Sequence, residues 1–379
     1  MKRFVTALSS LMSLAGLAFF AGSCSLIDEN LVDCPEDIIV DYHVRLITNK
    51  EQEMDLKLGT DKDLPLRQAL EDYLRDIFVE TARDANLSFY TRPADERALN
   101  ATDVWNSNGR TYELQLQSGD YVNLVAANLE GNGVVSYVGD ETSAGASFNQ
   151  NAKDIVASHK TGLYTARSAM RILDRTEYQH FDVDLYMAND AGGIVLNVDS
   201  CYFSNIRCEI EGLADGFNIL DSTYTYNAHT LVKTDLVDAQ PYVDKLSKTG
   251  GPARTGLYTQ HMWERWERTP VIMCGVGFSS RNMTEKFIDG MTVYWILHLY
   301  VTLESGSVTH STIYVAEPLP AGNLKIIVGW LLGNGSFSPD PPTPGPGPLP
   351  PEPPIEEKVI AGVDVELDWN PGPEFNPSL

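Results

Sequence analysis

The sequence IIVDYHVRL at residues 38–46 alternates between apolar and polar side chains. Every second residue from Ile38 to Leu46 is apolar or aromatic, and Asp41, His43 and Arg45 lie between them. Successive side chains of a β-strand point to opposite faces of the sheet. The pattern therefore predicts a strand with one buried and one solvent-facing side.

Short runs rich in β-branched and aromatic residues recur along the rest of the chain, separated by Gly, Asn, Asp or Ser. We predict strands at 85–91, 112–117, 121–128, 181–187, 193–199, 206–211, 271–278, 292–302, 311–315 and 324–332. Asn189-Asp190-Ala191-Gly192-Gly193 is rich in turn-forming residues, and we predict a turn and a domain boundary there. The pattern favours an all-β fold of two tandem antiparallel β-sandwich domains, at residues 38–190 and 191–337.

One stretch in the first half has helical rather than strand periodicity. Asp63 followed by Pro65 is a typical start for a helix. The apolar residues that then fall on one helical face are Leu66, Leu70, Tyr73, Leu74, Ile77 and Phe78. We expect a minor helical insertion in the first domain.

The C-terminal region has a different composition. Residues 338–354 contain ten prolines and one large apolar residue, Leu349, so residues 338–358 predict an extended linker with a reach of roughly 50 Å. Within residues 359–379, the side chains of Val363, Val365, Leu367 and Trp369 alternate with acidic ones and predict a final strand. This candidate donor strand either adds to the sheet of a neighbouring subunit or folds back onto its own second domain. The sequence leaves both alternatives open.

The N-terminus has the features of a secretory signal peptide. Lys2 and Arg3 precede an apolar run that extends to Phe20, and Ala21-Gly22-Ser23 leads to Cys24. The segment resembles a lipobox, in which the cysteine thiol is lipidated and the preceding residues are removed. We predict a signal peptide at 1–23, lipidation of Cys24, and a lipidated tether at 24–37. Acyl chains would hold the protein in a membrane. The acidic residues Asp28 and Glu29 behind Cys24 resemble the signal that sends lipoproteins of certain gut and oral anaerobes to the outer face of the outer membrane.

Charge and cysteine content limit the choice of partners. The mature chain of 356 residues would carry 26 basic and 52 acidic side chains and shows no basic stripe, which makes nucleic acid an improbable partner. Cys201 and Cys208 are close enough in the chain to form a disulfide, but buried thiols explain them equally well.

We find no sequence pattern for catalysis or for a cofactor. The seven histidines lack the spacing of a zinc helix, and there is no Cys-x-x-Cys, nucleophile elbow, phosphate loop or dinucleotide fingerprint. Asp182 and Asp184 share one face of a strand, where we expect a solvated surface. We therefore expect no catalytic residues, no metal site, no cofactor and no enzymatic activity.

The stretch from His261 to Arg268, HMWERWER, is unusual in composition. Trp263 and Trp266 would be able to stack on a sugar, which makes a surface glycan-binding lipoprotein an alternative function. A short helix whose tryptophans cover the sandwich, with Glu264 and Arg268 paired, is the simpler interpretation.

Residues 24–35, CSLIDENLVDCP, resemble the start of the fimbrillin-associated anchor lipoproteins of gut and oral anaerobes. Members of that family begin with a lipidated Cys, an acidic residue and Leu, followed by Cys-Pro about ten residues later. Residues 116–121, 181–185 and 363–369 also look similar to strand motifs of the family.

This resemblance implies two transthyretin-like β-sandwich domains and a structural role at the base of a surface fimbria. Such a protein tethers a fimbrial stalk subunit to the outer membrane and limits the length of the fimbria. A stalk or tip subunit remains an alternative, because these are also exported as lipoproteins. Stalk subunits lose their N-terminus by cleavage after a basic residue, for which Lys50 is a better site here than Arg45, which lies in the strand at 38–46.

Overall fold

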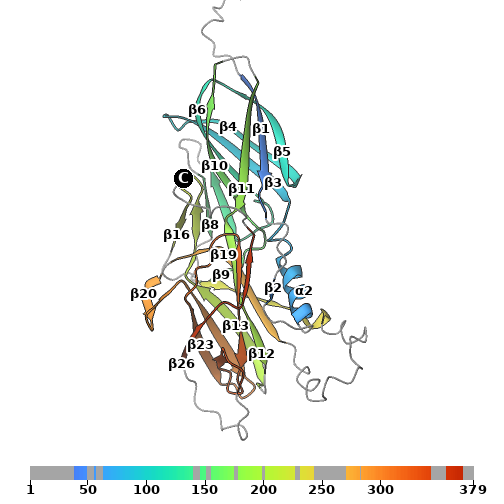
Figure 1. Cartoon of the computed structure of the whole chain (residues 1–379), viewed down its shortest axis with the longest axis vertical. Coiled ribbons are helices and arrows are strands. Elements are labelled where there is room, and N and C mark those ends of the chain that lie inside the picture. Colours follow the sequence, from blue (N-terminus) through green and yellow to red (C-terminus); the bar gives the residue numbers. More distant parts are fainter. Residues whose placement is uncertain are drawn as a thin grey trace, which may run out of the picture.

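The computed structural model describes residues 38–48, 55–56, 63–139, 146–150, 155–174, 178–198, 201–226, 231–242, 270–281, 283–342 and 356–369. Most of these residues are in β-strands. The strands form two β-sandwiches, which follow one another along the long axis of the molecule (Figure 1). The predicted all-β class with a minor helical insertion is confirmed. Within the described ranges, no helix has the length and apolar character needed to cross a membrane.

The first sandwich is one seven-stranded sheet folded over on itself. Its strand order is β4 (Arg97–Ser107), β3 (Ala82–Thr91), β6 (Gly119–Ala127), β10 (Tyr164–Ile172), β11 (Gln179–Met187), β1 (Ile38–Leu46) and β5 (Gly109–Leu116). Only Asn108 separates β4 from β5 in the chain, although these strands lie at opposite ends of the order. The β10–β11 pairing is limited to two residue pairs, and there the sheet turns from one layer to the other.

The alternation predicted for residues 38–46 is present in β1, and its buried side chains belong to the core of this sandwich. Val40, Tyr42 and Val44 are fully buried, whereas Ile39 between them is 61% exposed. The Tyr42 ring meets the edge of Phe89 in β3 at 5.3 Å between centroids, so β1 packs against the opposite layer. β1 lies in the interior of the sheet, antiparallel to β5 and parallel to β11.

The second sandwich has two larger sheets. One contains β14 (Leu213–Ala214), β19 (Val271–Ser280), β12 (Asn189–Val198), β24 (Asn323–Leu331), β27 (Val365–Asp368) and β2 (Asp55–Leu56), with β18 (Asp235–Val237) and β25 (Phe337–Ser338) paired to β19 and β24. The other contains β26 (Glu356–Ala361), β23 (Val308–Val315), β22 (Trp295–Leu303), β13 (Phe203–Glu211), β17 (Leu231–Lys233) and β9 (Ile155–Ala157). Ile194, Ile327, Leu297 and Ile313 belong to the core between these sheets.

Two small sheets complete the described structure. β16 (Thr223–Thr225), β15 (Gly216–Asn218), β8 (Ala146–Gln150) and β7 (Val135–Gly139) form a four-stranded sheet beside the first sandwich (Figure 1). β20 (Met283–Ile288) and β21 (Met291–Val293) form a hairpin. The strand predicted at 292–302 is therefore two strands, β21 and β22, separated at Tyr294.

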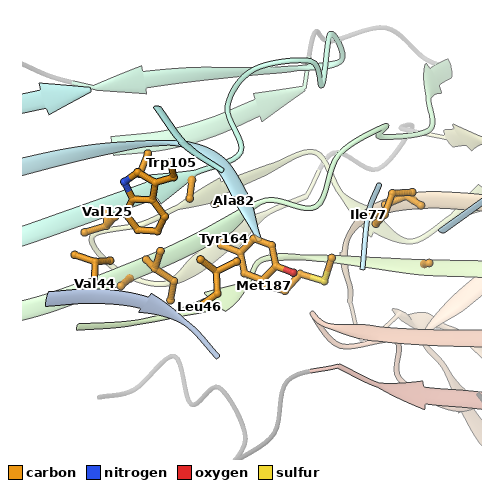
Figure 2. Packing of buried hydrophobic residues seen from close by; sticks show 14 of the residues in the cluster. Val44, Leu46, Ile77, Ala82, Trp105, Val125, Tyr164 and Met187 are labelled. Carbon is orange, nitrogen blue, oxygen red and sulfur yellow. The ribbon is translucent and has the colours of Figure 1, made fainter. Parts of the chain in front are cut away.

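The helix α2 (Asp63–Leu74) begins at the predicted residue and lies between the two sandwiches. Its apolar side chains Leu66, Leu70 and Leu74 are buried in a cluster that also contains β1 residues and residues of β12, β19, β24 and β27. Figure 2 shows part of this cluster, with Val44, Trp105 and Val125 near one end and Ile77 toward the other. A continuous core therefore connects both halves of the chain.

The turn predicted at Asn189–Gly193 is wrong. These five residues form the first half of β12 and are buried. Small residues are needed there because neighbouring groups approach closely: a Cβ atom at Gly193 would lie 2.4 Å from the carbonyl oxygen of Met273. Strands also pair across the predicted boundary at residue 190, since β9 pairs with β17 and β8 pairs with β15.

Candidate functional site: the C-terminal strands

The C-terminal segment forms two strands rather than the single strand that the alternation predicted. β26 ends at Ala361, and β27 begins at Val365. The chain crosses from one sheet of the second sandwich to the other between them, at Gly362-Val363-Asp364. The alternation of Val359, Ala361, Val363 and Val365 continues through the crossing, so it gives no sequence signal of it.

β26 forms the edge of the sheet that contains β22 and β13, where it pairs in parallel with β23. The register runs from His310 opposite Glu356 to Val315 opposite Ala361. Ala361 is buried in the core of the second sandwich, and Val359 and Val363 pack against the same core. The first part of the candidate donor segment therefore completes the sandwich of its own chain.

β27 lies within the other sheet, between β24 and β2. It pairs antiparallel with β24, from Asn323 opposite Asp368 to Ile326 opposite Val365, and its other edge pairs with Asp55 and Leu56. Val365 is 0% exposed and Leu367 is 6% exposed. Both belong to the cluster shared with α2 and the first sandwich, so Val363 and Val365 face different cores.

Trp369 connects the end of the segment to the first sandwich. Its backbone N–H donates to the carbonyl oxygen of Gly322 at 2.7 Å, and its indole Nε1–H donates to the Tyr164 hydroxyl at 3.1 Å. Its ring lies edge-on to Phe78, with 5.9 Å between centroids. An aromatic pair of this geometry adds about 0.5–1.5 kcal/mol beyond the area that it buries.

Polar contacts fix the register of β27. The backbone N–H of Asp364 donates to Ile326 O at 3.0 Å, and an Asp364 carboxylate oxygen accepts from the N–H of Val328 at 2.7 Å. The largely buried Lys325 ammonium lies 3.1 Å from Glu366 and 3.6 Å from Glu317. A buried lysine is tolerated only with such partners.

In this single chain the segment folds back onto its own sheets, and donation to a neighbouring subunit stays a prediction. The four residues Val363, Val365, Leu367 and Trp369 do not share one face, because the first packs into a different core from the other three. Donation to a neighbour would require release of β26 and β27 from both sheets. The short pairing with β2 was not foreseen, because a two-residue strand has no periodicity to detect.

Cys24, Trp263 and Trp266 lie outside the described residues. Cys201 and Cys208 are described, and both are buried thiols rather than a disulfide. Burial raises the pKa of the Cys208 thiol above its usual value, which makes it unreactive. Because Trp263 and Trp266 lie outside the described residues, glycan binding at these two tryptophans stays a prediction.

Asp182 and Asp184 lie on the outer face of the first sandwich. Asp182 is 3.1 Å from His43 and 3.2 Å from His180, and Asp184 accepts a hydrogen bond from Arg45 at 2.7 Å. The hydrogen bond with His43 is the largest effect lowering the pKa of Asp182. These side chains form substantially exposed ion pairs, and solvent screens such pairs so that they add little to stability.

No protein-family model and no curated protein matches the chain. Among solved structures, it is similar to a candidate adhesin from Bacteroides ovatus, with 14% identity, a TM-score of 0.46, and coverage of 88% of this chain and 94% of the other. It is similar to the fimbrial anchor protein Mfa2 from Porphyromonas gingivalis, with 9% identity, a TM-score of 0.40, and coverage of 71% and 79%. It is also similar to the tip fimbrial protein Mfa3 from the same organism, with 8% identity, a TM-score of 0.39, and coverage of 80% and 98%.

These three solved structures are an adhesin-class protein of Bacteroides and two fimbrial proteins of Porphyromonas.

Proposed function

We propose that the protein is the anchor subunit of a cell-surface fimbria, tethered to the outer membrane by lipid on Cys24 and bound to a fimbrial stalk subunit. The observation that carries the proposal is the N-terminal sequence, in which a signal peptide leads directly into the Cys24 to Pro35 motif. The role is structural, with neither catalysis nor a cofactor.

The position of β1 supports an anchor over a stalk subunit. A stalk subunit would lose its N-terminus by cleavage after a basic residue, and cleavage after Arg45 or Lys50 would remove β1. β1 is bonded on both sides, to β5 and β11, and Val40, Tyr42 and Val44 are fully buried. A protease cannot reach Arg45 without unfolding this sheet.

The C-terminal strands support the same role. With β1 retained and with β26 and β27 seated in their own sheets, both sandwiches are complete within one chain. A complete subunit has no need of a strand from a neighbour, and it can terminate a polymer. This fits a subunit at the base of a fimbria.

The proposal is tested by Cys24→Ala in the producing bacterium. The variant folds, because residue 24 precedes the first described strand, but it leaves the outer membrane fraction, and fimbriae detach into the medium. Cys34→Ala is the matched control, since it removes a nearby thiol and keeps the lipid. Retention of Cys24→Ala in the membrane after a high-salt wash, or fimbriae still attached to its cells, would contradict the proposal.

A further inference from the structure

A cluster of polar and aromatic side chains lies on the outer face of the second sandwich, away from the C-terminal strands' buried contacts. It contains Glu211 and Arg207 of β13, His298 and Tyr300 of β22, and His310 of β23. The two histidines are twelve residues apart in the sequence and lie on neighbouring strands. His298 Nδ1 and His310 Nε2 are 3.3 Å apart.

Glu211 determines which nitrogen of His298 carries the proton. Its carboxylate oxygen is 2.8 Å from His298 Nε2, and its other oxygen pairs with Lys286. The Glu211 carboxylate accepts hydrogen bonds from both Lys286 and His298. The neutral His298 ring therefore donates Nε2–H to Glu211 and presents the lone pair of Nδ1 toward His310.

The His310 ring is held in place by stacking. It lies parallel to Tyr300 at 4.3 Å between centroids, with 5° between the planes. The Arg207 guanidinium lies 3.7 Å from the centroid of the same tyrosine ring. These residues occupy directly opposed positions on three adjacent strands, so the sheet register produces the stack.

Two ring nitrogens at this distance match a pair of metal ligands. Imidazole nitrogens bind Zn²⁺ at about 2.0–2.1 Å, which in tetrahedral geometry places the two nitrogens about 3.3–3.4 Å apart. A histidine ligand whose other nitrogen donates to a carboxylate is the common arrangement around protein-bound zinc. The His298 side chain is 16% exposed, so an ion can reach it from solvent.

We propose that His298 Nδ1 and His310 Nε2 bind one divalent transition-metal ion, with Glu211 as the positioning residue behind His298. The ion takes the place of the proton on His310 Nε2, which goes to solvent, while His310 Nδ1 takes up a proton from solvent, so the ring stays neutral and no net proton is released. The described residues contain no group of three His, Cys, Asp or Glu side chains that could hold an ion together, so these two histidines are the protein ligands proposed among them. Nitrogen ligands favour Cu²⁺ over Zn²⁺ in affinity.

The second histidine pair of the molecule provides the matched control. His43 and His180 lie on β1 and β11, but their ring nitrogens are directed at carboxylates: His43 at Asp182, and His180 at Asp41 and Asp182. This pair has no direct contact between ring nitrogens among the described hydrogen bonds. The double variant H43Q/H180Q should therefore bind the ion as the wild type does.

The test uses the mature lipoprotein in detergent without a histidine tag, titrated with CuCl₂ and ZnCl₂ by calorimetry. We expect one equivalent of ion per chain, at least ten-fold weaker binding in H298Q and in H310Q, and about a ten-fold loss in Glu211→Gln. Electron paramagnetic resonance of the Cu²⁺ form should show two coordinated imidazole nitrogens in the wild type and in H43Q/H180Q.

Thermal melts of each variant without metal show whether the variant is folded. If a variant misfolds, the paramagnetic resonance spectrum of the Cu²⁺-loaded wild type still shows whether two imidazole nitrogens bind the ion. The proposal is overturned if the wild type binds neither ion, if its spectrum lacks two imidazole nitrogens, or if a folded H298Q/H310Q variant binds as tightly as the wild type.

Discussion

Gly193 lies at a close approach between β12 and β19. A Cβ atom there would meet the Met273 carbonyl oxygen at 2.4 Å and the Cα atom of Cys274 at 3.0 Å. We expect Gly193→Ala to lower the free energy of unfolding by about 1–3 kcal/mol, because buried backbone must move apart to accept the methyl group. Chemical denaturation measures the loss.

Gly362→Ala is the control for that substitution, because a Cβ atom at Gly362 meets no other atom within 4 Å. It should change the stability by less than about 0.5 kcal/mol. Equal effects of the two alanine variants would contradict the close packing of β12 against β19.

Asp190 is a fully buried carboxyl group, and neither of its oxygens has a hydrogen-bond partner in the described structure. Burial raises its pKa well above the usual value of 3.8. The folded protein therefore keeps a proton that the unfolded chain releases above about pH 4, and folding stability falls as pH rises, by up to about 1.4 kcal/mol per pH unit.

Asp190→Asn has the same shape and cannot ionise. We expect the variant to match the wild type near pH 4 and to be more stable at pH 7, with a difference that grows with pH. Melting temperatures across this range measure the effect. A difference between the two proteins that does not vary with pH would show that Asp190 is not held in its neutral form.

The two C-terminal strands, β26 and β27, pair with sheets of their own chain. Deletion of residues 355–379 removes the buried side chains of Ala361, Val365 and Leu367 and exposes the cores that they cover. We expect the melting temperature to fall by on the order of 10 °C or more. An unchanged melting temperature would instead support donation of the segment to another subunit.

A point variant makes the same comparison without a truncation. Leu367→Ala should cost about 2–5 kcal/mol, because Leu367 is 6% exposed in the cluster shared with α2. Leu236→Ala is its matched control, since Leu236 is 65% exposed on β18 and should tolerate the change within about 0.5 kcal/mol.

Elements with unbroken periodicity could be predicted from the sequence. β1 and α2 have their apolar side chains at regular intervals, and both form. Leu66, Leu70 and Leu74 of α2 are buried, but the helix ends at Leu74, before the predicted Ile77 and Phe78. The first residues of β12 could not be predicted as a strand, because Asn189, Asp190 and two glycines are typical of a turn. Here the small residues are needed for the close packing of β12 against its neighbours, which the sequence alone does not reveal. The histidine pair at 298 and 310 was missed because only the register of β22 with β23 brings the two rings together.

The whole molecule is stabilised by a core that runs from the first sandwich through α2 to the second. Tyr73 of α2 adds a polar connection, since its hydroxyl donates to Asp235 at 2.9 Å and contacts Ser158 at 3.1 Å. The two sandwiches predicted as separate domains therefore share buried surface and paired strands.

The central claim is that the mature protein keeps its N-terminal strand and carries lipid on Cys24. Mass spectrometry of the protein purified from the outer membrane tests it most directly. We expect an N-terminal peptide that begins at acylated Cys24 and continues through β1. A mature chain that begins near Glu51, without lipid and without β1, would rule out the anchor and identify a stalk subunit.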